Sequence, residues 1–250
     1  MGKRIIIFSA VFVLAALAFA ALGERLKPPL RREIIESGPA KKNKACRIGE
    51  EIIYDVRLGG VCLGEAKFKN VALAELNRSK VNLVTFETRL VRFIDREEIY
   101  SDLDTFLPVR VERDISMWPK KEKIIEEYDQ KNFTLVIKKL IGNKESQVII
   151  KRKSPISNAI LLPYSIRDIS GLDIGWSLSV TLPTQEFQIR LVSREEVATP
   201  AGPFDAYRFE SVPKKFEIWI SADKRRIPVK IKGTNKLGYT LVIKKYLFKD

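Results

Sequence analysis

The side chains that most often perform chemistry are sparse in this chain. There is no histidine among its 250 residues, which excludes Ser–His and Cys–His nucleophile pairs and most transition-metal sites. The two cysteines, Cys46 and Cys62, cannot form a four-cysteine zinc site. We identify no catalytic residue, no metal ligand and no cofactor motif. The sequence therefore favours a protein that is not an enzyme.

Carboxylates are the remaining candidates for acid–base work or calcium binding, and they occur mainly as doublets. The doublets are Glu50-Glu51, Glu97-Glu98, Glu126-Glu127 and Glu195-Glu196. Adjacent residues on a strand point to opposite faces, so the two members of a doublet cannot converge on one substrate. We therefore interpret the doublets as solvated strand ends. Asp102 and Asp104 share a face, but they lack the glycine and the distal glutamate of a calcium loop.

Basic residues are in excess, with 45 Lys and Arg against 31 Asp and Glu and a formal net charge of +14. Lys224, Arg225 and Arg226 form a charged turn, and guanidinium groups bind phosphate through paired hydrogen bonds. This turn is a candidate contact for an anionic lipid, a membrane surface or an acidic glycan. The alternative is that its charges only keep a β-protein soluble. No nucleic-acid-binding motif is present, so we do not expect nucleic acid as a partner.

The amino terminus predicts export. Lys3 and Arg4 precede an apolar run, and Ala18 and Ala20 have the spacing of a signal-peptidase site. Residues 1–20 are therefore interpreted as a signal peptide or, if it stays uncleaved, a membrane anchor. Residues 21–47 are basic, contain proline and predict a linker. The remaining chain is then periplasmic, or anchored to the inner membrane and facing the periplasm.

Residues 48–250 predict one antiparallel β domain because the apolar residues recur with a period of two. In the segment 51–58, Ile52, Tyr54 and Val56 share one face, and Gly59-Gly60 offers a tight turn into a second strand. Short strands of this kind continue to the carboxyl terminus, with one short helix near 157–168. We predict a mostly β fold: a single large curved antiparallel sheet, half-barrel or barrel of ten or more strands, wet on one face, preceded by an export helix.

The concave face of such a sheet is the candidate ligand site. If it encloses a cavity, the inward residues Tyr54, Val56, Phe68, Phe86, Phe187, Ile189, Phe216, Ile218 and Ile231 line that cavity. The cargo would be an apolar or amphipathic envelope molecule such as a lipid. If the core is filled instead, the protein is structural, or docks through its basic surface on anionic lipid, glycan or a protein partner.

The cysteines allow one disulfide in an oxidising compartment, between Cys46 and Cys62. The Gly59-Gly60 turn pairs Cys62 with Arg57, which leaves Cys46 beyond the far end of the hairpin. A direct cross-strand bond is therefore not expected from the register. The alternative is that Cys62 is a small buried residue.

Four stretches carry a resemblance to a known family. They are GEEIIYDVRLGGVCLGEAKF at 49–68, YSDLDTFLPVR at 100–110, EEVATPAGPFDAYRFE at 195–210 and WISADKRRIPVKIKG at 219–233. Together they resemble domain-of-unknown-function family 3108, a group of exported bacterial proteins, over about residues 49–248. The resemblance implies an envelope protein rich in antiparallel β-structure with no assigned activity, and it supplies no catalytic residue to transfer.

Overall fold

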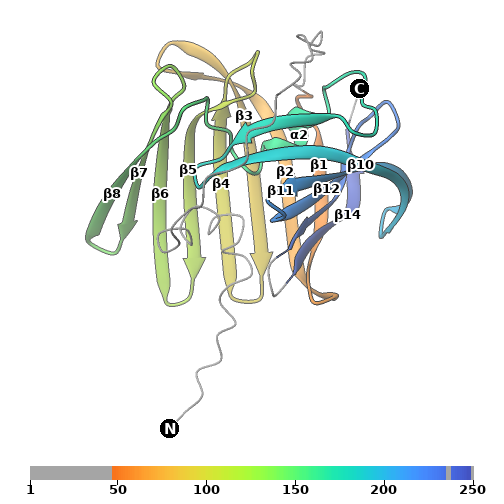
Figure 1. The fold of residues 1–250 in the computed structure, drawn as a ribbon. Helices are drawn as coiled ribbons and strands as arrows, with labels where there is room; N and C mark the ends of the chain where they lie inside the picture. Colours follow the sequence, from red (N-terminus) through yellow and green to blue (C-terminus); the bar gives the residue numbers. More distant parts are fainter. Residues whose placement is uncertain (1–46, 235–237, 249–250) are drawn as a thin grey trace.

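The computed structural model describes residues 47–234 and 238–248, which form one antiparallel sheet of 14 strands (Figure 1). The strands are β1 (Glu51–Leu58), β2 (Val61–Leu76), β3 (Ser79–Leu90), β4 (Phe93–Ser101), β5 (Pro108–Met117), β6 (Lys120–Asp129), β7 (Thr134–Ile141), β8 (Lys144–Lys151), β9 (Ser177–Thr181), β10 (Glu186–Thr199), β11 (Gly202–Val212), β12 (Phe216–Ser221), β13 (Pro228–Gly233) and β14 (Tyr239–Leu247). The predicted mostly β fold with a single large sheet is confirmed. The predicted export segment and the linker up to residue 46 lie outside the described residues.

Strands that follow one another in the sequence are neighbours in the sheet, except β8 and β9, which lie at its two ends. β1 pairs with β2 on one side and with β14 on the other, so two arms extend from it, one ending at β8 and the other at β9. The sheet curves strongly but does not close (Figure 1). Its first turn is the predicted one: Gly59 and Gly60 have φ angles of +56° and +89°, and Arg57 lies opposite Cys62.

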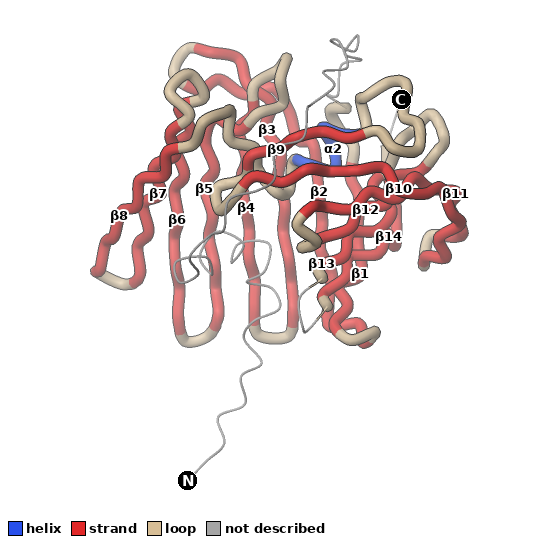
Figure 2. Tube along the Cα trace, in the orientation of Figure 1, coloured by secondary structure: helices blue, strands red, loops and turns tan. Residues whose placement is uncertain are grey.

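Helix α2 (Leu162–Ile166) lies within the curve of the sheet (Figure 2). Asn158 precedes it, and its side-chain oxygen accepts hydrogen bonds from the backbone N–H groups of Ile160 and Leu161 at 2.8 and 3.3 Å. The helix is shorter than the predicted 157–168 because a turn occupies residues 159–161 before Pro163 enters the first helical turn. Its buried residues pack on the sheet, so α2 fills part of the concave side.

The core is densest where α2, β1–β3 and β9–β14 meet, and we call this region the α2-packed half. The remaining strands form the β4–β8 arm. Inward residues of both regions belong to one continuous hydrophobic core, but the arm becomes more exposed toward its end. Seven of the eight residues of β8 are exposed, whereas all six residues of β12 are buried. Burial therefore falls along the sheet from the α2-packed half to the free end of the arm.

The prediction that one face of the sheet is wet is wrong at β12. Trp219 alternates with Ile218 and Ile220 and so takes the other face of the strand, yet it is only 4% exposed and belongs to the hydrophobic core. Lys230 lies 4.5 Å and Arg208 5.6 Å from the centre of its indole ring, and its indole N–H donates to Glu195 at 2.8 Å. The long basic side chains of the neighbouring strands cover the outer face here because their hydrocarbon stems pack on the ring.

The two end strands of the sheet are treated differently. The segment after β8 returns to β9, where Ile156 forms an isolated bridge with Thr181 and the Ser157 N–H donates to the Thr181 carbonyl at 2.7 Å. Arg152 also donates to the carbonyl oxygens of Pro183 and Thr184. The segment therefore covers part of the β9 edge, while β8, the end strand on the other side of the sheet, remains almost fully exposed.

The strand turns gather at the two ends of the sheet. The β1–β2, β3–β4, β5–β6 and β7–β8 turns lie along the lower edge in Figure 1, and we call this end the turn rim. The β4–β5 and β6–β7 loops and the charged turn 222–227 between β12 and β13 lie at the opposite end, as the antiparallel registers require. The charged turn and the turn rim are thus far apart.

Candidate functional site

The nine residues predicted to line a ligand cavity come together in the structure. All nine are buried at 9% exposure or less, and all belong to the continuous core. Phe68 stacks on Tyr164 of α2 with ring centres 3.6 Å apart, and Phe187 meets Phe216 at 5.3 Å. These side chains pack against one another and against the helix, so the nine residues form part of a packed core in the α2-packed half.

A buried ion pair ties α2 to the beginning of β1. Arg167, directly after the helix, donates to both carboxylate oxygens of Glu50 at 2.9 and 2.7 Å. Both side chains are at most 1% exposed. The Tyr246 hydroxyl donates to the same carboxylate at 3.1 Å. Our interpretation of Glu50 as a solvated strand end is therefore wrong, and the reason is a partner 117 residues away.

A pair of tyrosines joins the same helix to β1. The hydroxyl oxygens of Tyr54 and Tyr164 are 3.0 Å apart, and Tyr54 donates to the carbonyl of Pro228 at 2.9 Å. Burial raises the pKa of both phenols well above the usual range. Both therefore stay neutral at physiological pH, and the pair acts as a structural hydrogen bond that holds α2 against the sheet.

A second polar group lies on the concave face of the β4–β8 arm. It consists of the buried residues Asp95, Glu97 and Arg113 and the half-buried Glu126, and we call it the acid cluster. Arg113 donates to both Asp95 oxygens, from Nε at 2.7 Å, and its Nε lies 3.3 Å from Glu97. Glu126 accepts a hydrogen bond from Tyr128. Two carboxyl groups thus contact one guanidinium inside the curve of the sheet, and the third, Glu126, lies near enough to interact electrostatically with both Glu97 and Arg113.

The electrostatics of the acid cluster follow from this imbalance. Burial raises the pKa of Glu97 to about 8, against the attraction of Arg113, and the Asp95 carboxylate pushes it in the same direction. Burial also raises the pKa of Glu126. Two of the three carboxyl groups therefore resist ionisation, and a cationic group placed here would lower their pKa and pair with the carboxylates that form.

Apolar residues surround the acid cluster on the same strands. Ile99, Val111, Ile115 and Ile124 are inward-facing neighbours, each 8% exposed or less. The arrangement therefore combines a polar group with an apolar wall, which is the composition of a site for an amphipathic molecule.

Sequence reasoning missed this cluster because the doublets were read as pairs. Glu97 and Glu98 do point to opposite faces, but this places Glu97 on the inside, at 9% exposure. The available signal was the alternation itself. Asp95 and Glu97 stand in phase with buried Ile99, and Arg113 stands between Val111 and Ile115, so all of these must face inward.

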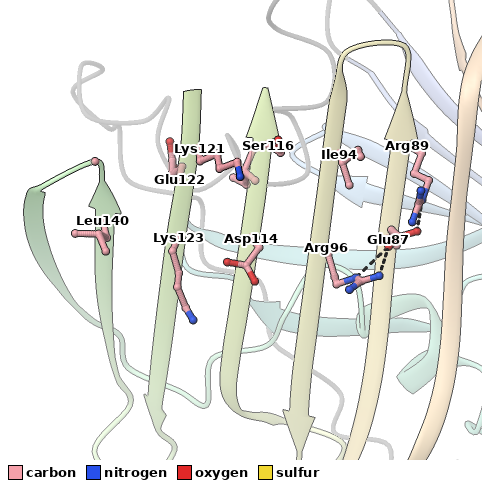
Figure 3. Close-up of a pocket in the computed structure, with 12 residues that line it drawn as sticks. Glu87, Arg89, Ile94, Arg96, Asp114, Ser116, Lys121, Glu122, Lys123 and Leu140 are labelled. Atoms are coloured by element: carbon pink, nitrogen blue, oxygen red, sulfur yellow. Dashed lines mark hydrogen bonds and ion pairs between the residues drawn. The ribbon is translucent and has the colours of Figure 1, made fainter. Parts of the chain in front are cut away.

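The outer face of the same strands carries a shallow hollow that is open to solvent (Figure 3). Arg96 lies 2.8 Å from Glu87, and Arg89 contacts the same carboxylate. Hydrogen bonds from Arg89 and Arg96 lower the pKa of Glu87. Because Glu87, Arg89 and Arg96 are already paired with one another, this hollow is a weaker candidate than the concave face.

The predicted anion contact at the charged turn is occupied by its own counter-charge. Arg225 donates to Asp223 from Nε at 2.8 Å and from Nη2 at 2.6 Å. Arg226 lies over the ring of Tyr207 at 4.8 Å, and Lys224 is exposed. These three residues lie between β12 and β13 in the α2-packed half, so they are not near the acid cluster on β4–β6.

The cysteine prediction is only partly within the described residues. Cys46 lies outside them, so the Cys46–Cys62 bond stays a prediction. Cys62 is exposed and its thiol donates to the Gly64 carbonyl at 3.6 Å, so the alternative that it is a buried residue is wrong.

Within residues 47–234 and 238–248, no group of three or more acidic or cysteine side chains is placed to hold a metal ion. Asp102 instead fixes a turn, since its carboxylate accepts hydrogen bonds from the backbone N–H groups of Asp104 and Thr105. In the same part of the chain, no helix has the length and apolar character needed to cross a bilayer.

Comparison with solved structures supports the fold. A β-barrel-like protein from Brucella abortus, of a domain of unknown function named DUF1849, has a TM-score of 0.50 at 9% identity, covering 81% of this chain and 98% of its own. A protein from Bacteroides fragilis described as exported, with a YmcC-like fold, has a TM-score of 0.31 at 10% identity, covering 84% and 100%. A protein from Parabacteroides distasonis described as a lipoprotein has a TM-score of 0.30 at 8% identity, covering 83% and 100%. The last two scores are too low to support an argument.

Comparison by sequence gives the family. A search of curated proteins finds no match. The model of a family described as proteins of unknown function, DUF3108, matches residues 53–244. That match runs from within β1 to within β14 and covers more than half of the chain, so this chain belongs to the DUF3108 family.

Proposed function

We propose that this chain is a non-catalytic protein of the cell envelope that holds an amphipathic ligand, such as a lipid, against the concave face of the β4–β8 arm. The amino-terminal sequence supports the location, because its basic start and apolar run are typical of an export signal.

The observation that carries the proposal is the acid cluster. Buried ion pairs seldom stabilise a fold more than well-packed apolar residues of the same size do, so a cluster with surplus carboxyl groups calls for a further role. Perturbed carboxyl groups within an apolar wall are typical of binding sites. The filled core around Tyr164 leaves the arm as the better place for a ligand.

The charge of the cluster selects the polar part of the ligand. Asp95, Glu97 and Glu126 outnumber the single Arg113, so they favour a group that carries positive charge or donates hydrogen bonds. A primary amine satisfies both conditions. The alternative is an anionic head group at the charged turn, where Lys224 and Arg225 are exposed at the opposite end of the sheet. The two ligand classes give a direct test.

The test is native mass spectrometry of the full chain purified from a membrane-containing extract. Bound lipid is then exchanged against equal amounts of phosphatidylethanolamine, which carries an amine, and phosphatidylglycerol, which does not. We expect retention of phosphatidylethanolamine and its loss in Glu97→Gln. Glu87→Gln is the matched control, since it makes the same change on the outer face. Equal retention of the amine lipid in both variants would contradict the proposed site.

A docking protein without cargo is the second candidate. The filled core of the α2-packed half favours it, because a core without a cavity suits a scaffold better than a carrier. The same experiment separates the two functions: a chain that retains neither lipid class, before or after exchange, is a docking protein.

A further inference from the structure

The turn rim exposes apolar side chains at its tips. Val91 in the β3–β4 turn is 93% exposed, Trp118 in the β5–β6 turn is 81% exposed, and Val61 after the β1–β2 turn is 63% exposed. Tryptophan is usually well buried, so its exposure at the tip of a hairpin is unusual. Trp118 also differs from Trp219, which is 4% exposed.

Two of these tips are direct neighbours. Phe93 at the start of β4 lies opposite Met117 at the end of β5, so the turns that carry Val91 and Trp118 stand side by side. Both residues line one shallow surface hollow together with Leu90, Phe93 and Ile94. The exposed apolar groups therefore form one patch rather than isolated positions.

The chemistry around the patch is basic. Arg92 follows Val91, and Lys120 and Lys121 follow Trp118 within the same two hairpins, and all three are exposed. Nearby Glu122 is paired with Lys139, so it does not neutralise these cations. An exposed tryptophan with adjacent lysine and arginine matches the border of a bilayer, where the indole lies among the head groups and cations contact anionic lipid.

We propose that the turn rim docks on an anionic membrane surface, with Trp118 and Val91 entering the interface and Arg92, Lys120 and Lys121 contacting lipid phosphates. The β3–β4 hairpin that bears Val91 leads directly into β4, where Phe93 is followed two residues later by Asp95 of the acid cluster. Docking in this orientation places the turn-rim end of the concave face toward the bilayer. The docking surface uses residues outside the acid cluster, so it stands or falls separately from ligand retention.

The experiment follows tryptophan fluorescence of the full chain mixed with vesicles of phosphatidylglycerol that carries bromine on its acyl chains. Bromine quenches only tryptophan that approaches the acyl region. We expect strong quenching in the parent chain, its loss in Trp118→Phe, and its retention in Trp176→Phe. This readout reports contact at the rim even if another segment of the chain also binds the vesicle. Equal quenching in both variants would overturn the proposal.

A charge reversal tests the basic part of the surface. Each basic residue near an anionic surface adds attraction, so Lys120→Glu should lower the affinity for phosphatidylglycerol vesicles about tenfold at low salt. Lys131→Glu is the matched control, because this exposed lysine lies in the β6–β7 loop at the opposite end of the sheet. The effect of Lys120→Glu should vanish on phosphatidylcholine vesicles, which carry no net charge. Equal weakening by the two substitutions would contradict docking through the rim.

Discussion

The α2-packed half and the β4–β8 arm use buried charge in opposite ways. Next to α2, the Glu50 carboxylate is neutralised, since Arg167 binds both of its oxygens and Arg47 lies 3.6 Å from one of them. In the arm, one arginine contacts two carboxyl groups with a third, Glu126, close by, and burial raises the pKa of Glu97 to about 8. The first arrangement is balanced and holds a helix in place. The second has surplus acid in an arm whose burial falls toward β8, which is why we assign binding to the arm.

The largest expected effect comes from breaking the balanced pair. Arg167→Met leaves the fully buried Glu50 carboxylate without its main partner, which should cost roughly 3–5 kcal/mol in the free energy of unfolding. Chemical denaturation of the full chain measures this. Arg194→Met is the matched control, since its partner Asp205 is exposed and the pair lies at the surface. A loss in Arg167→Met no larger than in the control would show that the pair does not hold α2.

The surplus acid of the arm predicts a dependence of stability on pH. The pKa of Glu97 in the folded protein lies above its unfolded value of about 4.5, so the protonated side chain stabilises the fold. This contribution to the free energy of unfolding is fully present below pH 4.5 and is lost as pH rises through 8. We expect the free energy of unfolding to fall by on the order of 2 kcal/mol between pH 5 and pH 8. Denaturation at a series of pH values measures the slope.

Two variants sharpen the pH prediction. Glu97→Gln should flatten the slope between pH 6.5 and 8. Asp168, whose pKa is raised to about 6 by burial near α2, contributes with the same sign below pH 6.5, so Asp168→Asn should flatten only that lower range. A slope above pH 6.5 that survives Glu97→Gln would place the titrating group elsewhere.

Packing density gives the next test. Val56 is 5% exposed within the filled core, so Val56→Phe should lose roughly 1–3 kcal/mol from overpacking. If an unfilled cavity lies beside Val56, the larger side chain fits with little loss. Thermal unfolding distinguishes these results, and a nearly neutral Val56→Phe would move the ligand site back to the α2-packed half.

The smallest effect is expected at the free end of the arm. Ile149 on β8 is 60% exposed and contributes little to the core. Ile149→Thr keeps a β-branched side chain and should change the free energy of unfolding by less than about 0.5 kcal/mol. A loss above 1 kcal/mol, measured by the same denaturation, would mean that β8 is covered in the protein in solution.

Local patterns predicted much of the fold and little of the site. The alternation of Ile52, Tyr54 and Val56 and the Gly59-Gly60 turn were enough for the first hairpin, because strand period and turn conformation are local properties. The pairing of β1 with β14 depends on contacts across nearly the whole chain, and no local pattern reveals it. For the same reason the partner of Glu50 was not predictable from its own strand.

The acid cluster could have been predicted from the sequence, but we considered the glutamate doublets only as adjacent pairs. A strand alternation that is followed through Asp95, Glu97 and Ile99 places charged residues on the buried face, and this conflict with simple burial marks a site. Whether the core is filled or encloses a cavity could not be predicted from local patterns. It depends on how far Tyr164 reaches across the concave face, which requires the three-dimensional position of α2.

The central claim is that the arm, and not the α2-packed half, holds the ligand. Hydrogen–deuterium exchange of the full chain, with and without phosphatidylethanolamine in mixed micelles, tests it most directly. We predict slower exchange in β4 and β5 around Glu97 and Arg113 when the lipid is present, and unchanged exchange in β11–β13 around Ile218. Slower exchange around Ile218 with none around Glu97 would contradict the account.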